Sequence, residues 1–121
     1  MTDHFSQPGK SLSLKILSPV PFKERFPAGR LKPPVGIMPG DVRSLPELHL
    51  FLEPDDASLP GINLKRLPDW LEASIGDGEL ASSVREIVDQ SVNYVADCLK
   101  VYEVVGVRLN QARKTIKEAE R

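Results

Sequence analysis

The sequence predicts a mainly α protein with a long C-terminal helix and a proline-rich, extended N-terminal arm. All 11 prolines lie between residues 8 and 68, whereas apolar residues recur at helical spacing in residues 69–121. Proline lacks a backbone N–H and fixes φ, so the first half is expected to form only short elements. We therefore predict an arm over residues 1–67 and a helical domain, bundle-like or coiled-coil-like, over residues 68–121.

Two short strands are predicted within the arm, at residues 11–17 and 47–53. In each segment leucine or isoleucine alternates with mostly polar residues, which is typical of a half-buried strand. Residues 22–41 are rich in proline and glycine and predict an extended loop. Four aromatic side chains are expected to anchor the arm by packing: Phe22, Phe26, Phe51 and Trp70.

Two helices are predicted in the second segment. Proline in a first turn and Gly76 as a stop predict a short helix at residues 68–75. Apolar residues that alternate at spacings of four and three predict one long helix over about 80–120, which begins between residues 77 and 83. Glycine and β-branched residues near Gly106 are unfavourable inside a helix, so a break or a strand there is the alternative. Arg108 and later basic residues suit the negative C-terminal end of this helix.

The length of the second predicted helix indicates assembly. At 1.5 Å per residue it would be about 60 Å long, whereas a compact globule of this size has a diameter of roughly 36 Å. We therefore expect the helix to pack on a protein partner or on copies of the chain. The residues expected at this helix interface are Val84, Val88, Val95, Tyr102, Val105, Leu109 and Ile116.

Composition and motifs argue against catalysis and membrane insertion. No apolar run approaches the roughly 20 residues that span a bilayer, and the first residues lack the apolar stretch of a secretion signal, so we expect a soluble, cytoplasmic protein. The recognisable nucleotide, hydrolase and zinc motifs are absent from the sequence. We expect no enzyme activity, and hence no catalytic residues, no metal and no cofactor. The single cysteine, Cys98, is expected to pack as a small apolar side chain.

Charge is unevenly distributed along the chain. Residues 1–43 carry seven Lys/Arg against three Asp/Glu, and residues 44–77 carry two against seven. The leading hypothesis is a non-enzymatic structural subunit that assembles through the long helix and docks its arm on a partner or a neighbouring protomer. The alternative is a nucleic-acid-binding accessory protein that uses the basic segment 22–43 to contact phosphates. The cations of that segment are Lys23, Arg25, Arg30, Lys32 and Arg43.

Overall fold

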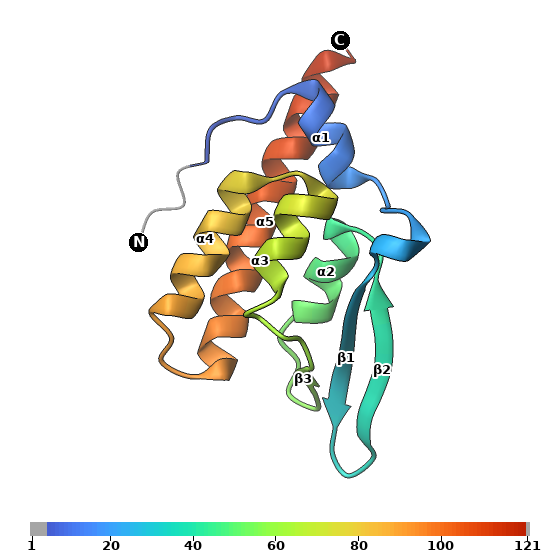
Figure 1. Ribbon diagram of the computed structural model, residues 1–121, viewed down its shortest axis with the longest axis vertical. Coiled ribbons are helices and arrows are strands. Elements are labelled where there is room, and N and C mark those ends of the chain that lie inside the picture. Colours follow the sequence, from blue (N-terminus) through green and yellow to red (C-terminus); the bar gives the residue numbers. More distant parts are fainter. Residues whose placement is uncertain (1–4, 121) are drawn as a thin grey trace.

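The computed structural model describes residues 5–120, which form a mostly helical fold with one small antiparallel sheet (Figure 1). The prediction of a mainly α protein with a long C-terminal helix is confirmed. The helices are α1 (Lys10–Leu17), α2 (Leu45–Leu52), α3 (Leu67–Trp70), α4 (Gly78–Asp89) and α5 (Tyr94–Ala119). The strands are β1 (Phe26–Lys32), β2 (Gly36–Val42) and β3 (Leu59–Pro60), and the short helical turns are η1 (Phe22–Glu24) and η2 (Leu71–Ile75).

Helix α5 is the element on which α1, α2 and α4 pack. One hydrophobic cluster joins side chains from both halves of the sequence, including Ile16 of α1, Leu48 of α2, Leu80 of α4 and Leu109 of α5. The two predicted segments therefore share one core. The hairpin formed by β1 and β2 projects beyond the helices, and β3 lies between this hairpin and the rest of the fold (Figure 1).

The strand predicted at residues 47–53 is wrong, because this segment forms α2. Its buried leucines are Leu45, Leu48 and Leu52, at the spacing of three and four that places side chains on one face of a helix. Leu50, which completed the apparent alternation, is exposed to solvent. The hydroxyl of Ser44 caps the helix by accepting the backbone N–H three residues later at 3.3 Å.

The strand predicted at residues 11–17 is also wrong, because this segment forms α1. Ser13 and Ile16 are its buried residues, three apart, while Leu14 is exposed. A pattern of apolar and polar residues that covers only seven positions does not distinguish a helix from a strand. Packing on α5 decides between the two, because a helix places Ser13 and Ile16 on the same face, whereas a strand would place them on opposite faces.

The extended loop predicted over residues 22–41 is wrong, because most of this segment forms the hairpin. β1 and β2 pair antiparallel from Phe26 opposite Val42 to Lys32 opposite Gly36. Gly36 closes the turn with φ of 103°, in the left-handed region that suits glycine. Proline does not prevent pairing here, because it is tolerated on an edge strand where its missing N–H faces outward.

Pro39 occupies such an outward position on β2. The carbonyl of Gly29, in the middle of β1, accepts the N–H of Gly61 at 2.7 Å, so the backbone groups of Gly29 face β3. Pro39 lies directly opposite Gly29, in a pair that does not exchange hydrogen bonds. The backbone nitrogen of Pro39 therefore faces the free edge of the sheet and leaves the pairing with β1 intact.

The single long helix predicted over about 80–120 is wrong, because α4 ends at Asp89 and α5 begins at Tyr94. The side chain of Asn93 caps the second helix by accepting the N–H of Ala96 at 2.8 Å. The chain turns back at this point, and α4 packs beside α5 instead of extending it (Figure 1). At 26 residues, α5 is about 39 Å long, and the core of the same chain covers much of it.

Other predicted boundaries in this half are confirmed. The short helix expected at residues 68–75 corresponds to α3 followed directly by η2, which ends at Gly76 in the left-handed conformation. The helix start expected between residues 77 and 83 corresponds to the first residue of α4, capped by the side chain of Asp77.

Gly106 lies inside α5, where it makes room for a ring from α2. A Cβ atom at this position would lie 3.0 Å from Nε2 of His49. The imidazole of His49 stacks on the ring of Tyr102, with the ring centres 4.2 Å apart and the planes 3° from parallel. Burial lowers the pKa of His49, and the nearby charge of Arg113 lowers it further.

A buried ion pair joins α5 to the start of α4. Nε of Arg108 donates to Oδ2 of Asp77 at 2.7 Å, and both side chains are only 1% exposed. The same guanidinium donates to the carbonyl of Ser6 at 2.7 Å and contacts the half-exposed carboxylate of Glu79 at 3.3 Å. Arg108 therefore ties together three segments that are far apart in sequence, rather than lying free near the C-terminal end of the helix.

We predict that Asp77→Ala lowers the free energy of unfolding by about 3–5 kcal/mol, because the variant removes the one buried counter-charge of Arg108 and leaves only the half-exposed carboxylate of Glu79. Urea denaturation measures this change. In the control Glu79→Ala, only a half-exposed partner is lost, and the decrease should stay below about 1 kcal/mol. Equal effects of the two substitutions would contradict the role assigned to the buried pair.

We also predict that His49 makes the fold less stable in mild acid. Because its folded-state pKa is lowered, the unfolded chain binds more protons, and stability falls as the pH drops through the unfolded-state value near 6.5. Urea midpoints measured at about pH 7.5 and about pH 5.5 should therefore differ more for the natural protein than for His49→Phe, which keeps a ring on Tyr102 but cannot titrate. The same pH dependence in both proteins would show that His49 is not responsible.

Candidate functional site

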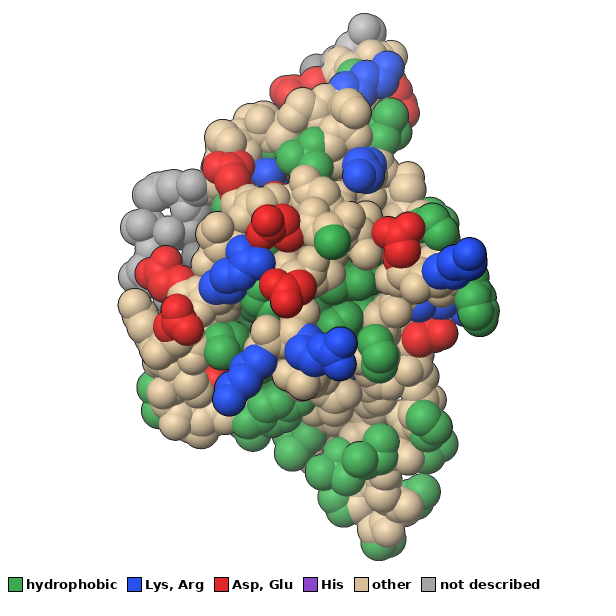
Figure 2. Space-filling model, viewed as in Figure 1, with side chains coloured by type: hydrophobic (Ala, Val, Ile, Leu, Met, Phe, Trp, Pro, Cys, Tyr) green, Lys and Arg blue, Asp and Glu red, His purple; other side chains and the backbone are tan. Residues whose placement is uncertain are grey.

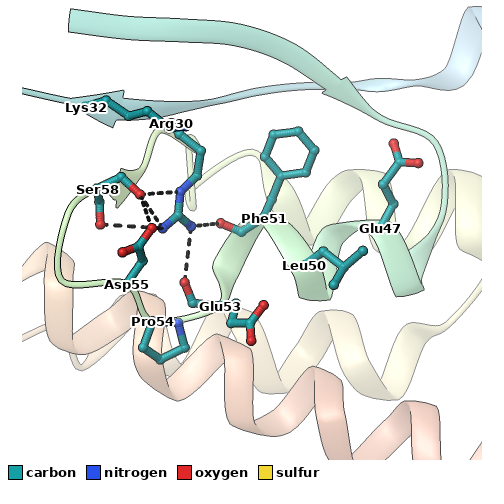
Figure 3. Close-up of a pocket in the computed structure, with 9 residues that line it drawn as sticks. All are labelled: Arg30, Lys32, Glu47, Leu50, Phe51, Glu53, Pro54, Asp55 and Ser58. Carbon is teal, nitrogen blue, oxygen red and sulfur yellow. Dashed lines mark hydrogen bonds and ion pairs between the residues drawn. The ribbon is translucent and has the colours of Figure 1, made fainter. Parts of the chain in front are cut away.

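Arg30 fixes the projecting hairpin to the end of α2 (Figure 3). Its Nη1 donates to the carbonyl oxygens of Phe51 at 2.5 Å and Glu53 at 3.2 Å. Its Nη2 donates to the hydroxyl of Ser58 at 2.8 Å and lies 3.8 Å from a carboxylate oxygen of Asp55. The last carbonyls of a helix have no partner within the helix, so the guanidinium of Arg30 acts as a cap for α2.

The anchoring by Arg30 gives the hairpin an inner face and an outer face. Arg30 lies on the inner face, as does Gly40, where an added Cβ would lie 3.3 Å from the ring of Phe51. Successive side chains of a strand point to opposite sides. Leu31 and Ile37, which are opposite each other on β1 and β2, therefore lie on the outer face, away from α2.

An exposed strip of apolar side chains runs from this outer face to the start of α5. Leu31 is paired with Ile37 on one side and with Leu59 of β3 on the other. Leu59, Val95 and Leu99 line one hollow of about 180 Å³. Ile37 is 68% exposed and Val95 is 55% exposed. The strip, called the apolar strip below, consists of Leu31, Val35, Ile37, Leu59, Val95 and Leu99.

Figure 2 shows apolar side chains gathered on the projecting end of the molecule, which is the hairpin in the matching view of Figure 1. Val35, in the turn between β1 and β2, is 74% exposed. Charged side chains are instead spread over the helical part of the face shown. On this face, apolar side chains therefore predominate at the end of the hairpin.

The tyrosine at the start of α5 holds the two ends of the apolar strip together. The hydroxyl of Tyr94 donates to the carbonyl of Pro60 at 2.5 Å and accepts the N–H of Ile62 at 2.9 Å. Burial raises the pKa of Tyr94 to about 12, so the hydroxyl stays protonated and keeps donating at neutral pH. These bonds fix β3, and with it Leu59, beside the first turn of α5.

The residues predicted for a helix interface do not gather on one exposed surface. One of them, Val95, belongs to the apolar strip. The others lie against or within the chain's own core to different degrees: Val84, Val105 and Leu109 are fully buried, Val88 and Tyr102 pack against the core, and Ile116 is half-buried.

Three of the four predicted arm anchors pack against other parts of the fold, and one contact, between Phe26 and Trp70, joins the two halves of the chain. The rings of Phe26 and Trp70 lie 5.6 Å apart, and the indole N–H of Trp70 donates to the carbonyl of Glu24. Phe51 lies under the hairpin at Gly40. The fourth anchor, Phe22, is exposed. The guanidinium carbon of Arg25 lies over its ring, 4.5 Å from the ring centre.

The basic segment 22–43 offers less free positive charge than its sequence indicates. Arg30 is engaged in capping α2. Arg25 lies 3.5 Å from a carboxylate oxygen of Asp41, and Arg43 lies 3.1 Å from one of Glu47. Each internal pair offsets charge that would otherwise attract a phosphate backbone. The nucleic-acid alternative stays a prediction.

The cysteine thiol is not set up as a nucleophile. Cys98 is buried, and burial raises the pKa of its thiol, so the thiolate that would react is disfavoured. Among residues 5–120, no three His, Cys, Asp or Glu side chains gather where they could hold a metal ion. The chemistry that the apolar strip offers is therefore contact between apolar surfaces.

Sequence reasoning missed Leu31, Ile37 and Leu59 as surface residues. A clue to Leu31 and Ile37 was present, because apolar residues flank the Pro33-Pro34 pair on both sides. Reading the prolines as an interruption hid the pairing that brings these side chains together.

Comparison with protein-family models, curated proteins and solved structures finds no match for the chain. Within the described part of the chain, no helix combines the length and the apolar character needed to cross a membrane. The function is therefore argued from the geometry of the apolar strip and the groups around it.

We predict that Arg30→Ala loosens the hairpin without unfolding the helices. Losing hydrogen bonds from a charged donor should cost about 1.5–3 kcal/mol locally, which corresponds to amide exchange in β1 and β2 that is about tenfold faster or more. Hydrogen exchange followed by mass spectrometry measures this effect. Lys32→Ala, which removes a neighbouring exposed cation, should leave exchange in the hairpin unchanged. Uniformly faster exchange in α4 and α5 would instead show that Arg30 supports the whole fold.

Proposed function

We propose that this protein is a non-enzymatic interaction module whose apolar strip binds a short, basic, amphipathic segment of a partner protein. The observation that carries the proposal is the continuity of the apolar strip across three elements: the hairpin, β3 and the start of α5. Contiguous exposed apolar surface in a monomer is typical of a binding site for another macromolecule.

The size of the apolar strip favours a peptide segment over a second globular surface. An interface between two folded proteins typically involves about 20–30 residues a side. The strip has six. A segment that follows the strip from Ile37 to Leu99 with alternating or helically spaced apolar side chains would cover these residues without needing further contacts.

The charge around the apolar strip favours a basic partner. Asp55 and Asp56 line the same hollow as Leu59 and Val95. Arg30 offsets part of the charge of Asp55, whereas Asp56 forms no ion pair among the described residues. Hydrogen bonds from the N–H of Ala57 and the hydroxyl of Ser58 lower the pKa of Asp55, which keeps this carboxyl ionised well into the acidic range. Acidic groups beside an apolar hollow attract Lys and Arg and repel acidic segments, which adds specificity to apolar contact.

The free edge of β2 favours contact through side chains. A partner that joined the sheet as a further strand would need the N–H groups along that edge. Pro39 faces the edge and has no N–H to offer. The partner is therefore expected to lie across the outer face of the hairpin, and the hairpin takes the docking role that the sequence assigned to an extended arm.

This proposal keeps part of the assembly role expected for the helical half. Helix α5 contributes Val95 and Leu99 to the apolar strip, so its first turns would take part in binding while its middle forms the core. A helix interface made by copies of the chain is not needed for this role.

The proposal is tested by selecting phage-displayed random peptides of about 12 residues on the natural protein. We expect the recovered peptides to combine apolar residues with Lys or Arg. Their binding, measured by fluorescence polarisation, should weaken at least tenfold in Val95→Asp, because a charge in the hollow must be desolvated on binding.

Leu50→Asp is the matched control, since Leu50 is 66% exposed on α2 but lies outside the apolar strip. It should bind the selected peptides as the natural protein does. Failure to recover any binding peptide, or recovery of peptides that bind Val95→Asp equally well, would overturn the proposal. Predominantly acidic peptides would retain a binding function but refute the basic partner.

A further inference from the structure

A buried carboxylate next to the apolar strip has one oxygen that is not hydrogen-bonded. Asp97, in the first turn of α5, is only 4% exposed. The hydroxyl of Ser91 donates to its Oδ2. Its Oδ1 is buried and has no hydrogen-bond partner among residues 5–120. A buried carboxylate oxygen without a donor is costly, because the charge has left water without a replacement.

Asp97 lines a hollow of about 290 Å³ that opens beside the apolar strip. Asn63, Lys65 and Ser91 line the same hollow. Tyr94 lines both this hollow and the one formed by Leu59, Val95 and Leu99, so the two hollows adjoin at this residue. A segment seated on the apolar strip therefore passes within one side chain of Asp97.

The surroundings of Asp97 supply a hydrogen bond to one carboxylate oxygen but not to the other. A negative charge in the first turn of a helix is stabilised by the helix dipole, and the Ser91 hydroxyl fixes the carboxylate in place. Neither contact satisfies Oδ1. Lys65 is the cation that lines the hollow, yet no ion pair joins it to Asp97 in the described part of the chain.

We propose that Asp97 is a specificity site that binds the ammonium or guanidinium group of one Lys or Arg side chain, supplied by the partner segment seated on the apolar strip. This inference rests on the proposed function for the identity of the ligand, and it adds a fixed basic position beside the apolar ones. A cationic donor supplies the hydrogen bond that Oδ1 lacks and neutralises the buried charge. The hollow is wide enough for an alkyl chain that ends in such a group. Because Oδ1 is shielded from solvent in the free protein, the carboxylate of Asp97 must turn toward the hollow to meet it.

The site is tested without a partner, with n-butylammonium chloride as a probe for lysine and n-butylguanidinium chloride as a probe for arginine. Backbone amide shifts of Asn63, Ser91 and Asp97 are followed by nuclear magnetic resonance at constant ionic strength. We expect saturable shifts with at least one probe, and the tighter probe identifies the preferred side chain. Asp97→Asn keeps an oxygen for the Ser91 hydroxyl and should weaken binding about tenfold or more.

Two further variants make the outcome decisive. Asp89→Asn, which removes an exposed carboxylate of α4 outside the hollow, should bind the probes unchanged. Lys65→Glu replaces an exposed cation at the hollow and should tighten binding about threefold or more, and this test remains if Asp97→Asn does not fold. An absence of saturable shifts, or equal binding by the natural protein and Asp97→Asn, would overturn the inference and leave Oδ1 to be satisfied by water.

The two proposals fail separately. If the probes bind but no peptide is selected, the cation site stands and the docking role of the apolar strip does not. If apolar peptides are selected whose affinity is unchanged in Asp97→Asn, the docking role stands and the assignment of Asp97 is wrong.

Discussion

The buried pair between Arg108 and Asp77 is the contact on which the arrangement of the helices depends. Asp77 caps α4, Arg108 lies in the middle of α5, and the same guanidinium binds the carbonyl of Ser6. Each partner is too deeply buried to be left without the other, so α4 and the N-terminal segment are confined to one position along α5. Asp97 and Cys98 in the first turns of α5 are buried, whereas Val95 and Leu99 on another side of the same turns remain exposed.

Arg30 anchors the hairpin to α2, as Arg108 anchors the helices to one another. Both guanidiniums bind carbonyl oxygens and a carboxylate from segments distant in sequence, which suits the fixed, multiply donating geometry of arginine. Arg30 holds the inner face of the hairpin on α2, and as a consequence the outer face is turned to solvent. The exposed position of the apolar strip therefore follows from how the hairpin is anchored.

The sequence predicted the helix ends of the second half better than the elements of the first, for physical reasons. Gly76 and Asp77 act through local geometry and capping, which are readable from neighbouring residues. Whether residues 11–17 become a strand or a helix depends on which side chains meet α5, and that contact is remote in sequence. The turn between α4 and α5 was missed because the helical spacing of apolar residues continues through it. Asn93, which caps α5, is the local sign of a new helix start.

The candidate site was less accessible to sequence reasoning than the fold. Val95 was identified from helical spacing, but its neighbours on the apolar strip belong to strands whose pairing was not foreseen. Asp97 was hidden for a different reason, since a carboxylate in the first turn of a helix is ordinary and only its burial makes it unusual.

The apolar strip lies on a sheet that is protected against the commonest form of unwanted association. An exposed edge strand invites pairing with another copy, and Pro39 removes a donor from that edge. The acidic side chains beside Leu59 and Val95 add repulsion between two copies of the strip, because the same charges would face each other across a symmetric contact. A basic segment that lies across the outer face needs no N–H from the edge strand and is not repelled by the acidic side chains. The edge and the charges together thus disfavour self-association at this surface while leaving its outer face open to a partner of opposite charge.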